Sequence, residues 1–144
     1  MLKLNTKHFL TGTELNRDEL MGVIDLAESL REERKTGKRR SEMSGKNMAL
    51  VFEKPSLRTR MSFTVAVNEL GGEALELVSA VRKKEEPEDT AMVISQYSHA
   101  IMVRTFEHSI LERMAAKCPV PIINGLSDSH HPCQVLADLQ TLKQ

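Results

Sequence analysis

The stretch NMALVFEKPSLRTRMSF, residues 47–63, decides how this chain folds. Its first six residues form a short apolar run bounded by turn signals, which is typical of a strand buried in a parallel sheet. From about Arg58 the pattern becomes helical, with Phe63, Val67 and Leu70 on one face, and a Gly-Gly pair follows as a helix stop signal. The stretch therefore predicts a buried strand, a polar turn and a helix, in that order.

The same alternation continues on both sides of this stretch. Residues 16–34 predict an amphipathic helix that begins with Asn16 and Glu19 in a capping-box arrangement. Further strands are predicted at 73–78, 100–104 and 120–124, and further helices at 90–99, 109–117 and from about 131. Strand and helix alternating four times predict an α/β fold: a three-layer sandwich with a central four-stranded parallel sheet and helices on both faces.

Composition and charge fit a single domain, residues 1–144, of ordinary globular type. The 20 basic and 20 acidic residues balance, which argues against nucleic-acid binding, because domains that bind nucleic acids are usually strongly basic. The basic loop at 35–46 is interpreted as a solvated connector. The alternative is an anion or nucleic-acid patch built on Lys35, Lys38, Arg39 and Arg40.

Cysteine usage and hydropathy narrow the class of protein further. Cys118 and Cys133 are too few for a disulfide framework, and no Cys/His cluster has the spacing of a zinc site. The first residues, MLKLNTKHFLTG, contain no long apolar core, so we expect neither a signal peptide nor a membrane span, and a cytoplasmic location. Four methionines on apolar faces are expected to fill the core: Met21, Met92, Met102 and Met114.

Polar side chains follow three of the predicted strands. Residues 53–60 come after the first strand, Arg104 ends the third, and NGLSDSHHPCQ, residues 124–134, follows the fourth. In open parallel sheets ligands bind beyond the carboxyl ends of the strands, which lie at one edge. We therefore expect these three segments to meet in one site.

The start of the second predicted helix has the chemistry of an anion site. Free backbone N–H groups and the positive end of the helix dipole favour an anion there. Ser56 and Thr59 add hydroxyl donors, and Arg58 adds a planar fork that matches phosphate. A Walker loop is absent, so a small phosphorylated molecule is a better match than a nucleotide.

Each candidate also has a plainer interpretation. For Arg58 and Arg60 it is two surface helix residues, one of them paired with an acid such as Glu53. For Arg104 it is a structural ion pair, because a charge at the end of an apolar strand is costly unless paired. For His131 it is a helix cap or a surface residue.

Three separated motifs together carry a resemblance. They are FEKPSLRTRMSF at 52–63, AIMVRTFEH at 100–108 and INGLSDSHHPCQVLADL at 123–139. In this order and spacing they closely resemble the carbamoyl-phosphate-binding domain of the carbamoyltransferase family, from about residue 5 to the end. FEKPS, HPCQ and LAD look like the ornithine branch, since the aspartate branch usually has Thr in place of Cys in the last motif.

The resemblance implies roles for the first motif. Ser56, Leu57, Arg58 and Thr59 match the family's phosphate loop. The Ser and Thr hydroxyls, the Leu57 backbone N–H and the Arg58 guanidinium would hold the phosphate of carbamoyl phosphate. Arg60 in similar proteins is more a structural partner than a ligand.

The later motifs are implied to hold the carbamoyl group. Arg104 and His131, with Thr59, would surround its carbonyl oxygen, and Gln134 would hold its nitrogen. Arg58, Arg104 and His131 are the implied catalytic residues. Cys133 receives no nucleophilic role, and no metal or redox cofactor is implied. The implied reaction transfers the carbamoyl group to ornithine, giving citrulline and phosphate in arginine biosynthesis, in a homotrimer.

The sequence also departs from the family pattern. Leu57 stands where Thr is common, and in the loop before Asp89, Ala80 and Lys83 stand near positions that reach a neighbouring subunit in similar enzymes. The family chain has a second domain that binds the amino-acid substrate, and this sequence stops before it. We therefore expect the chain to bind carbamoyl phosphate but barely to turn it over. The alternatives are an aspartate carbamoyltransferase domain of pyrimidine biosynthesis and a stand-alone binding module without catalysis.

Overall fold

The computed structural model describes residues 1–78 and 85–144. The helices are α1 (Arg17–Lys35), α2 (Arg58–Glu69), α3 (Pro87–Ser95), α4 (His108–Lys117) and α5 (Pro132–Lys143). The strands are β1 (Asn47–Phe52), β2 (Glu73–Val78), β3 (Ala100–Arg104) and β4 (Ile122–Leu126).

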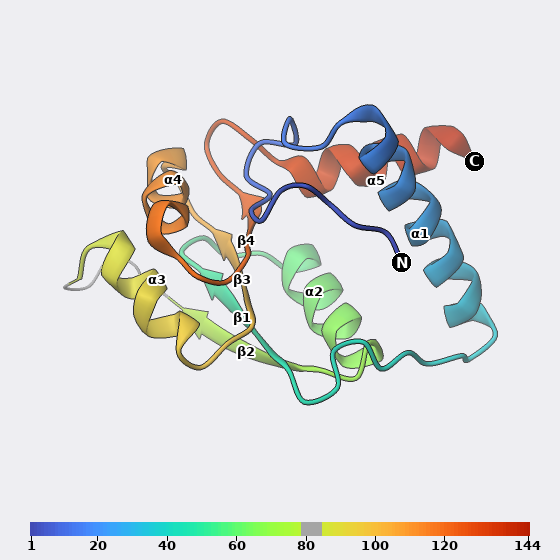
Figure 1. The fold of residues 1–144 in the computed structure, drawn as a ribbon, viewed down its shortest axis with the longest axis horizontal. Helices are drawn as coiled ribbons and strands as arrows, with labels where there is room; N and C mark the ends of the chain where they lie inside the picture. The colour runs from blue at the N-terminus through green and yellow to red at the C-terminus, as the bar shows by residue number, and fades with distance from the viewer. Residues whose placement is uncertain (79–84) are drawn as a thin grey trace.

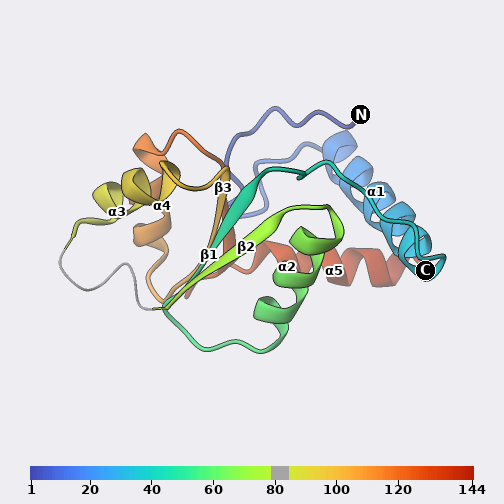
Figure 2. The same cartoon turned by 90° about the horizontal axis from the view of Figure 1, so that it is seen from below.

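The four strands form one parallel sheet in the order β2-β1-β3-β4. Helices α3 and α4 cover one face, and α2 and α5 cover the other, with α1 outermost beside α5 (Figure 1). The view from below shows the same three layers (Figure 2). The predicted α/β sandwich is confirmed.

The sheet is buried on both faces, as the apolar run of β1 predicts. Ala49 and Val51 pack with α3 and α4, whereas Leu50 and Phe52 pack on the opposite side with Val67 of α2. Successive strand residues point to opposite faces, so one short strand supplies both cores.

Local signals fix the ends of the helices. The predicted capping box of α1 is present, because Asn16 accepts from the Glu19 backbone and the Glu19 carboxylate accepts from the Asn16 backbone. Helix α2 ends before Gly71, whose φ of 83° is a left-handed conformation that favours glycine. The Gly-Gly pair therefore marks the end of α2, as the sequence predicts.

The bounds of two elements and the burial of two core residues were predicted wrongly. Helix α3 runs over Pro87–Ser95 instead of the predicted 90–99, and proline suits the first turn of a helix. Strand β4 lies two residues later than the predicted 120–124. Met21 and Met92 are about 40% exposed, unlike the fully buried Met102 and Met114.

An N-terminal arm pairs with β4 in a way that the sequence did not indicate. Phe9 forms a parallel bridge with Ile123, donating to the carbonyl of Ile122 and accepting from the backbone of Asn124. The His8 ring nitrogen Nδ1 accepts from the Ile122 backbone at 3.0 Å. The arm thereby covers an edge of the sheet that would otherwise be open.

Candidate functional site

Between β1 and β3 the order in which the chain adds strands to the sheet changes side. From β1 the chain moves outward to β2, then crosses back to β3 and β4. Phe52, the last residue of β1, is paired with Arg104, the last residue of β3. Ligands of doubly wound sheets bind at such a switch point, so the loop after β1 and the end of β3 lie where a site is expected.

One cavity of about 580 Å³ opens at this edge of the sheet. It is lined by the loop before α2, the first turns of α2, the end of β3, the end of β4 and the start of α5. All seven residues predicted for the site line it: Ser56, Leu57, Arg58, Thr59, Arg104, His131 and Gln134. The three motifs therefore share one crevice.

The start of α2 is held by hydroxyl groups. Ser56 Oγ accepts a hydrogen bond from the Thr59 backbone at 3.1 Å, and Thr59 Oγ1 accepts from Arg104 Nη1, also at 3.1 Å. No acidic residue lies in the first turn of this helix. The positive end of the helix dipole is therefore left for a ligand from outside the helix.

Arg104 lines the cavity without a charged partner among the described residues. Its Nε is buried and has no hydrogen-bond partner among the described residues. Burial lowers the pKa of its guanidinium. No carboxylate in residues 1–78 and 85–144 forms an ion pair with Arg104 or Arg58. The structural ion pair considered for Arg104 is therefore absent from the described part of the chain.

Arg60 lies two residues away from Arg58 but faces elsewhere. Its Nε pairs with Glu76 of β2 at 2.7 Å, and its guanidinium lies over the ring of Phe52. It does not line the cavity. Arg60 therefore has a structural partner, and that partner is Glu76, not the Glu53 named from the sequence.

His131 and Gln134 enter from the start of α5. Burial is the main cause that lowers the pKa of His131, the charge of Arg104 lowers it further, and Asp138 acts in the opposite direction. The His131 Nδ1 is buried without a hydrogen-bond partner among the described residues. Gln134 Nε2 donates to Asp138 Oδ1 at 2.9 Å. Both side chains belong to the cavity wall.

Cys133 lines the cavity but is held as a thiol. Burial raises its pKa from 9 to about 11, and its Sγ lies 3.5 Å from the Asn124 carbonyl oxygen. A thiol with a raised pKa is a poor nucleophile at neutral pH. This agrees with the absence of a nucleophilic role in the sequence interpretation.

Two supporting residues were missed from the sequence. Asn124 is fully buried, and its Nδ2 donates to the carbonyls of Leu10 and His130 and to Ser127 Oγ, which ties the arm to the loop before α5. Gly125 sits at a register shift between β3 and β4 and lines the cavity, and a Cβ there would collide with the Met102 sulfur. A glycine directly after an apolar strand was the available signal.

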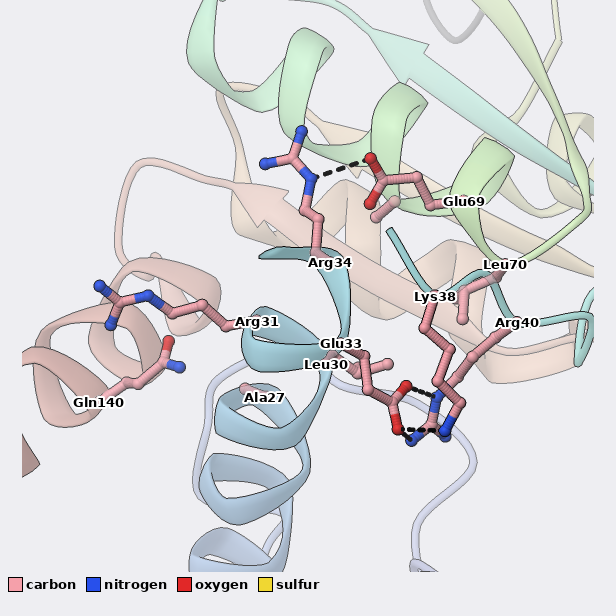
Figure 3. Close-up of a pocket in the computed structure, with 11 residues that line it drawn as sticks. Ala27, Leu30, Arg31, Glu33, Arg34, Lys38, Arg40, Glu69, Leu70 and Gln140 are labelled. Atoms are coloured by element: carbon pink, nitrogen blue, oxygen red, sulfur yellow. Dashed lines mark hydrogen bonds and ion pairs between the residues drawn. The ribbon is translucent and has the colours of Figure 1, made fainter. Parts of the chain in front are cut away.

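A second cavity, of about 330 Å³, lies between α1 and the end of α2 (Figure 3). Three of its four basic side chains are paired with acids, because Lys38 and Arg40 pair with Glu33, and Arg34 pairs with Glu69, whereas Arg31 has no such pair among the described residues. Lys35 in the same loop pairs with Glu32. These ion pairs favour the solvated connector over a nucleic-acid patch.

Three further sequence expectations concern metals, membranes and the loop after β2. Within the described residues, no group of three or more His, Cys, Asp or Glu side chains could hold a metal ion. No helix in the same part of the chain is long and apolar enough to span a membrane. Ala80 and Lys83 lie outside the described residues.

Comparisons with known proteins agree with this geometry. An ornithine carbamoyltransferase of Anoxybacillus flavithermus is 46% identical over an alignment of 144 positions, which covers 98% of this chain and 46% of the relative. The structure of ornithine carbamoyltransferase from Pyrococcus furiosus matches with a TM-score of 0.91 and 41% identity, over 94% of this chain and 44% of that one.

A third match comes from an enzyme with a different name. An N-acetyl-L-ornithine transcarbamylase, complexed with carbamyl phosphate and N-succinyl-L-norvaline, has a TM-score of 0.85 and 31% identity, over 96% of this chain and 48% of that chain. This chain thus spans about half the length of the relatives that it matches.

The family match covers nearly the whole sequence. Residues 7–144 match the domain described as "Aspartate/ornithine carbamoyltransferase, carbamoyl-P binding domain". The matched residues include all four strands and the whole cavity wall. The chain therefore belongs to the aspartate/ornithine carbamoyltransferase family, whose carbamoyl-phosphate-binding domain it carries.

Proposed function

We propose that the cavity at the strand ends binds carbamoyl phosphate and that, joined to an amino-acid-binding domain, this chain transfers the carbamoyl group to ornithine. The products are citrulline and phosphate, as in arginine biosynthesis. The observation that carries the proposal is that Arg104, which pairs with no carboxylate among the described residues, lines the same cavity as the start of α2, whose first turn contains no acidic residue. A guanidinium that no acid neutralises and a helix start without an acidic residue both favour an anionic ligand.

The lining residues divide into two groups that suit the two ends of carbamoyl phosphate. Ser56, Leu57 and Arg58 lie at the start of α2, where a phosphate gains hydrogen bonds and the helix dipole. Arg104 and His131 enter from the far wall and suit the carbonyl oxygen.

The same donors serve the reaction. The amine nitrogen attacks the carbonyl carbon, a C–N bond forms, and the carbonyl oxygen gains negative charge. Thr59, Arg104 and His131 provide donors on that side, and preorganised donors stabilise such charge. The C–O bond to phosphate then breaks, and phosphate leaves toward Arg58 and the positive end of α2. The amine proton is lost to solvent or to a group of the second domain.

The choice of amine is part of the proposal and rests on the relatives. The cavity wall contains no carboxylate among the described residues, so it offers no negative charge to pair with the α-ammonium of ornithine. Because this chain spans about half of its relatives, we assign the amino acid to a second domain and the lone chain to binding with little turnover. An aspartate-specific partner domain is the alternative.

The proposal includes a trimer and a cytoplasmic location. Leu57, Met61 and Val78 are exposed around the start of α2 and the end of the edge strand β2. Contiguous exposed apolar residues of this kind are typical of a protein interface. The two free cysteines, Cys118 and Cys133, fit a reducing compartment. Sedimentation equilibrium of the chain tests the trimer.

Calorimetry with carbamoyl phosphate tests the binding site. We expect measurable binding by the parent and a loss of about 2 kcal/mol or more in Arg58→Ala, because a charged hydrogen bond is removed. Arg60→Ala is the matched control, since Arg60 is held by Glu76 outside the cavity, and its affinity should stay within about twofold. Equal affinity of parent and Arg58→Ala contradicts the site. Robust citrulline formation by the 144 residues alone contradicts the need for a second domain.

A further inference from the structure

The Gln134 side chain is hydrogen-bonded to Asp138, a residue outside the cavity wall. Its amide nitrogen Nε2 donates to Asp138 Oδ1 at 2.9 Å, one turn later along α5. Gln134 lines the cavity, whereas Asp138 does not. We infer that Asp138 is a positioning residue that fixes which end of the Gln134 amide meets the ligand, and that the site thereby selects a carbamoyl group over an acetyl group. The inference rests on the proposed function.

The orientation follows from the chemistry of the two groups. An ionised carboxylate accepts hydrogen bonds but donates none, so only the NH₂ end of the amide can face Asp138. The carbonyl oxygen Oε1 is then the end left available for a ligand. Carbamoyl phosphate carries an NH₂ group that can donate to this oxygen. Acetyl phosphate has a methyl group at the same place and can make no such bond.

Among the described residues the Gln134 side chain hydrogen-bonds to Asp138 alone, so without the carboxylate nothing there distinguishes the two ends of its amide. A turned amide would present its own NH₂ to the NH₂ of the ligand, donor against donor. An unpaired donor in a binding site costs more than the bond that it replaces. Asp138 therefore contributes to affinity for carbamoyl phosphate without touching it.

Two other roles of Asp138 predict different results. As a simple i,i+4 surface pair it would support α5 by a few tenths of a kcal/mol and leave ligand affinity unchanged. As a negative charge near the site it would repel any phosphorylated ligand, so its removal would tighten binding of both ligands equally. The ratio of the two affinities separates positioning from both alternatives.

Calorimetry of the 144-residue chain with carbamoyl phosphate and with acetyl phosphate tests the inference. We expect Asp138→Ala to weaken the binding of carbamoyl phosphate about fivefold relative to the binding of acetyl phosphate. Asp138→Glu keeps an acceptor and should keep most of the preference. In a Gln134→Ala background, Asp138→Ala should leave the ratio unchanged, because the amide it positions is gone.

The results that would overturn this inference differ from those that would overturn the proposed function. An unchanged ratio in Asp138→Ala, or the same change in ratio with and without Gln134, overturns the positioning role and leaves carbamoyl phosphate binding intact. Failure of the parent to bind either ligand overturns the proposed function and the inference together. Thermal unfolding of each variant shows whether α5 is retained. If the alanine variant does not fold, Asp138→Asn supplies the result, because its amide can meet either end of the Gln134 amide and should lose most of the preference.

Discussion

Arg104 Nη1 donates to Thr59 Oγ1 at 3.1 Å, which joins the end of β3 to the first turn of α2 across 45 positions of sequence. Thr59 is buried, so water competes little for its hydroxyl. One side of the guanidinium is thereby fixed, while Nε has no partner among the described residues. The bond aligns the arginine before any ligand arrives, and such preorganisation lowers the cost of binding.

Thr59→Val should weaken binding of carbamoyl phosphate by about tenfold, because the valine keeps the shape but loses the hydroxyl that orients Arg104. Titration calorimetry gives the affinity, and urea unfolding should show a loss of no more than about 1.5 kcal/mol. Thr59→Ser is the control: it keeps the oxygen and should bind almost as the parent does. Parent-like affinity in the valine variant would show that the Arg104 contact does not matter for the ligand.

Arg104→Met should separate binding from stability. Methionine fills much of the same volume and removes a buried donor that lacks a partner, so we expect the free energy of unfolding to stay within about 1 kcal/mol of the parent or to rise. Binding of carbamoyl phosphate should be lost. Urea denaturation and calorimetry on the same preparation measure both quantities.

Arg113→Met is the matched control for this change. Arg113 pairs with Glu88 at 2.7 Å and lies on α4, away from the cavity, so its loss should leave binding unchanged. A drop in stability above about 2 kcal/mol in Arg104→Met, with binding retained, would make Arg104 a structural residue.

Stability should fall as the pH drops below about 6.5, in part through His8. Burial, with a smaller contribution from Lys7, lowers the pKa of His8, whose Nδ1 must be unprotonated to accept from the Ile122 backbone. When the pKa of a histidine is lower in the folded state than in the unfolded state, the histidine stabilises the fold at pH values above its unfolded-state pKa. This stabilisation is lost as the pH falls through the pKa of the folded state. His8→Gln should therefore flatten the curve of unfolding midpoint against pH.

The same measurement on His8→Gln can also contradict the role given to His8. Thermal unfolding at intervals between pH 8 and pH 5 would compare the variant with the parent. Parallel curves across this range would mean that the arm does not depend on His8 protonation. His131, whose pKa is lowered as well, contributes with the same sign, so a small slope should persist in the variant.

The sequence predicted the sheet and the cavity because each rests on a local pattern. The apolar run at Asn47–Phe52 and the polar turn after it are contiguous, and parallel topology then brings their counterparts at Arg104 and His131 to the same edge. The seven lining residues follow from that rule together with the family resemblance. Long-range backbone pairing has no such local signature, so the bridge between Phe9 and Ile123 was missed.

Side-chain partners were harder to predict than side-chain positions. Arg60 was expected to have a structural partner, but that partner is Glu76 of β2 and not Glu53, which follows β1, and the pairing of β2 with β1 brings Glu76 close. Helix α3 began earlier than expected because Pro87 was treated as a loop residue, although its fixed φ suits a first helical turn. The first error comes from tertiary geometry, and the second from a local signal that was given too little weight.

Cys133 should react slowly with iodoacetamide in the folded protein. Burial holds the pKa of its thiol at about 11, and only the thiolate is alkylated, so at pH 8 the reactive fraction is about a hundredth of that of a thiol with a pKa of 9. Mass spectrometry of timed samples gives the rate at this position, and the same protein in urea, where the thiol is exposed, should be modified rapidly. Cys133→Ala should bind carbamoyl phosphate within about threefold of the parent, because we give the thiol no part in the reaction. Rapid alkylation of the native chain, suppressed by carbamoyl phosphate, would instead place a reactive thiolate inside the cavity.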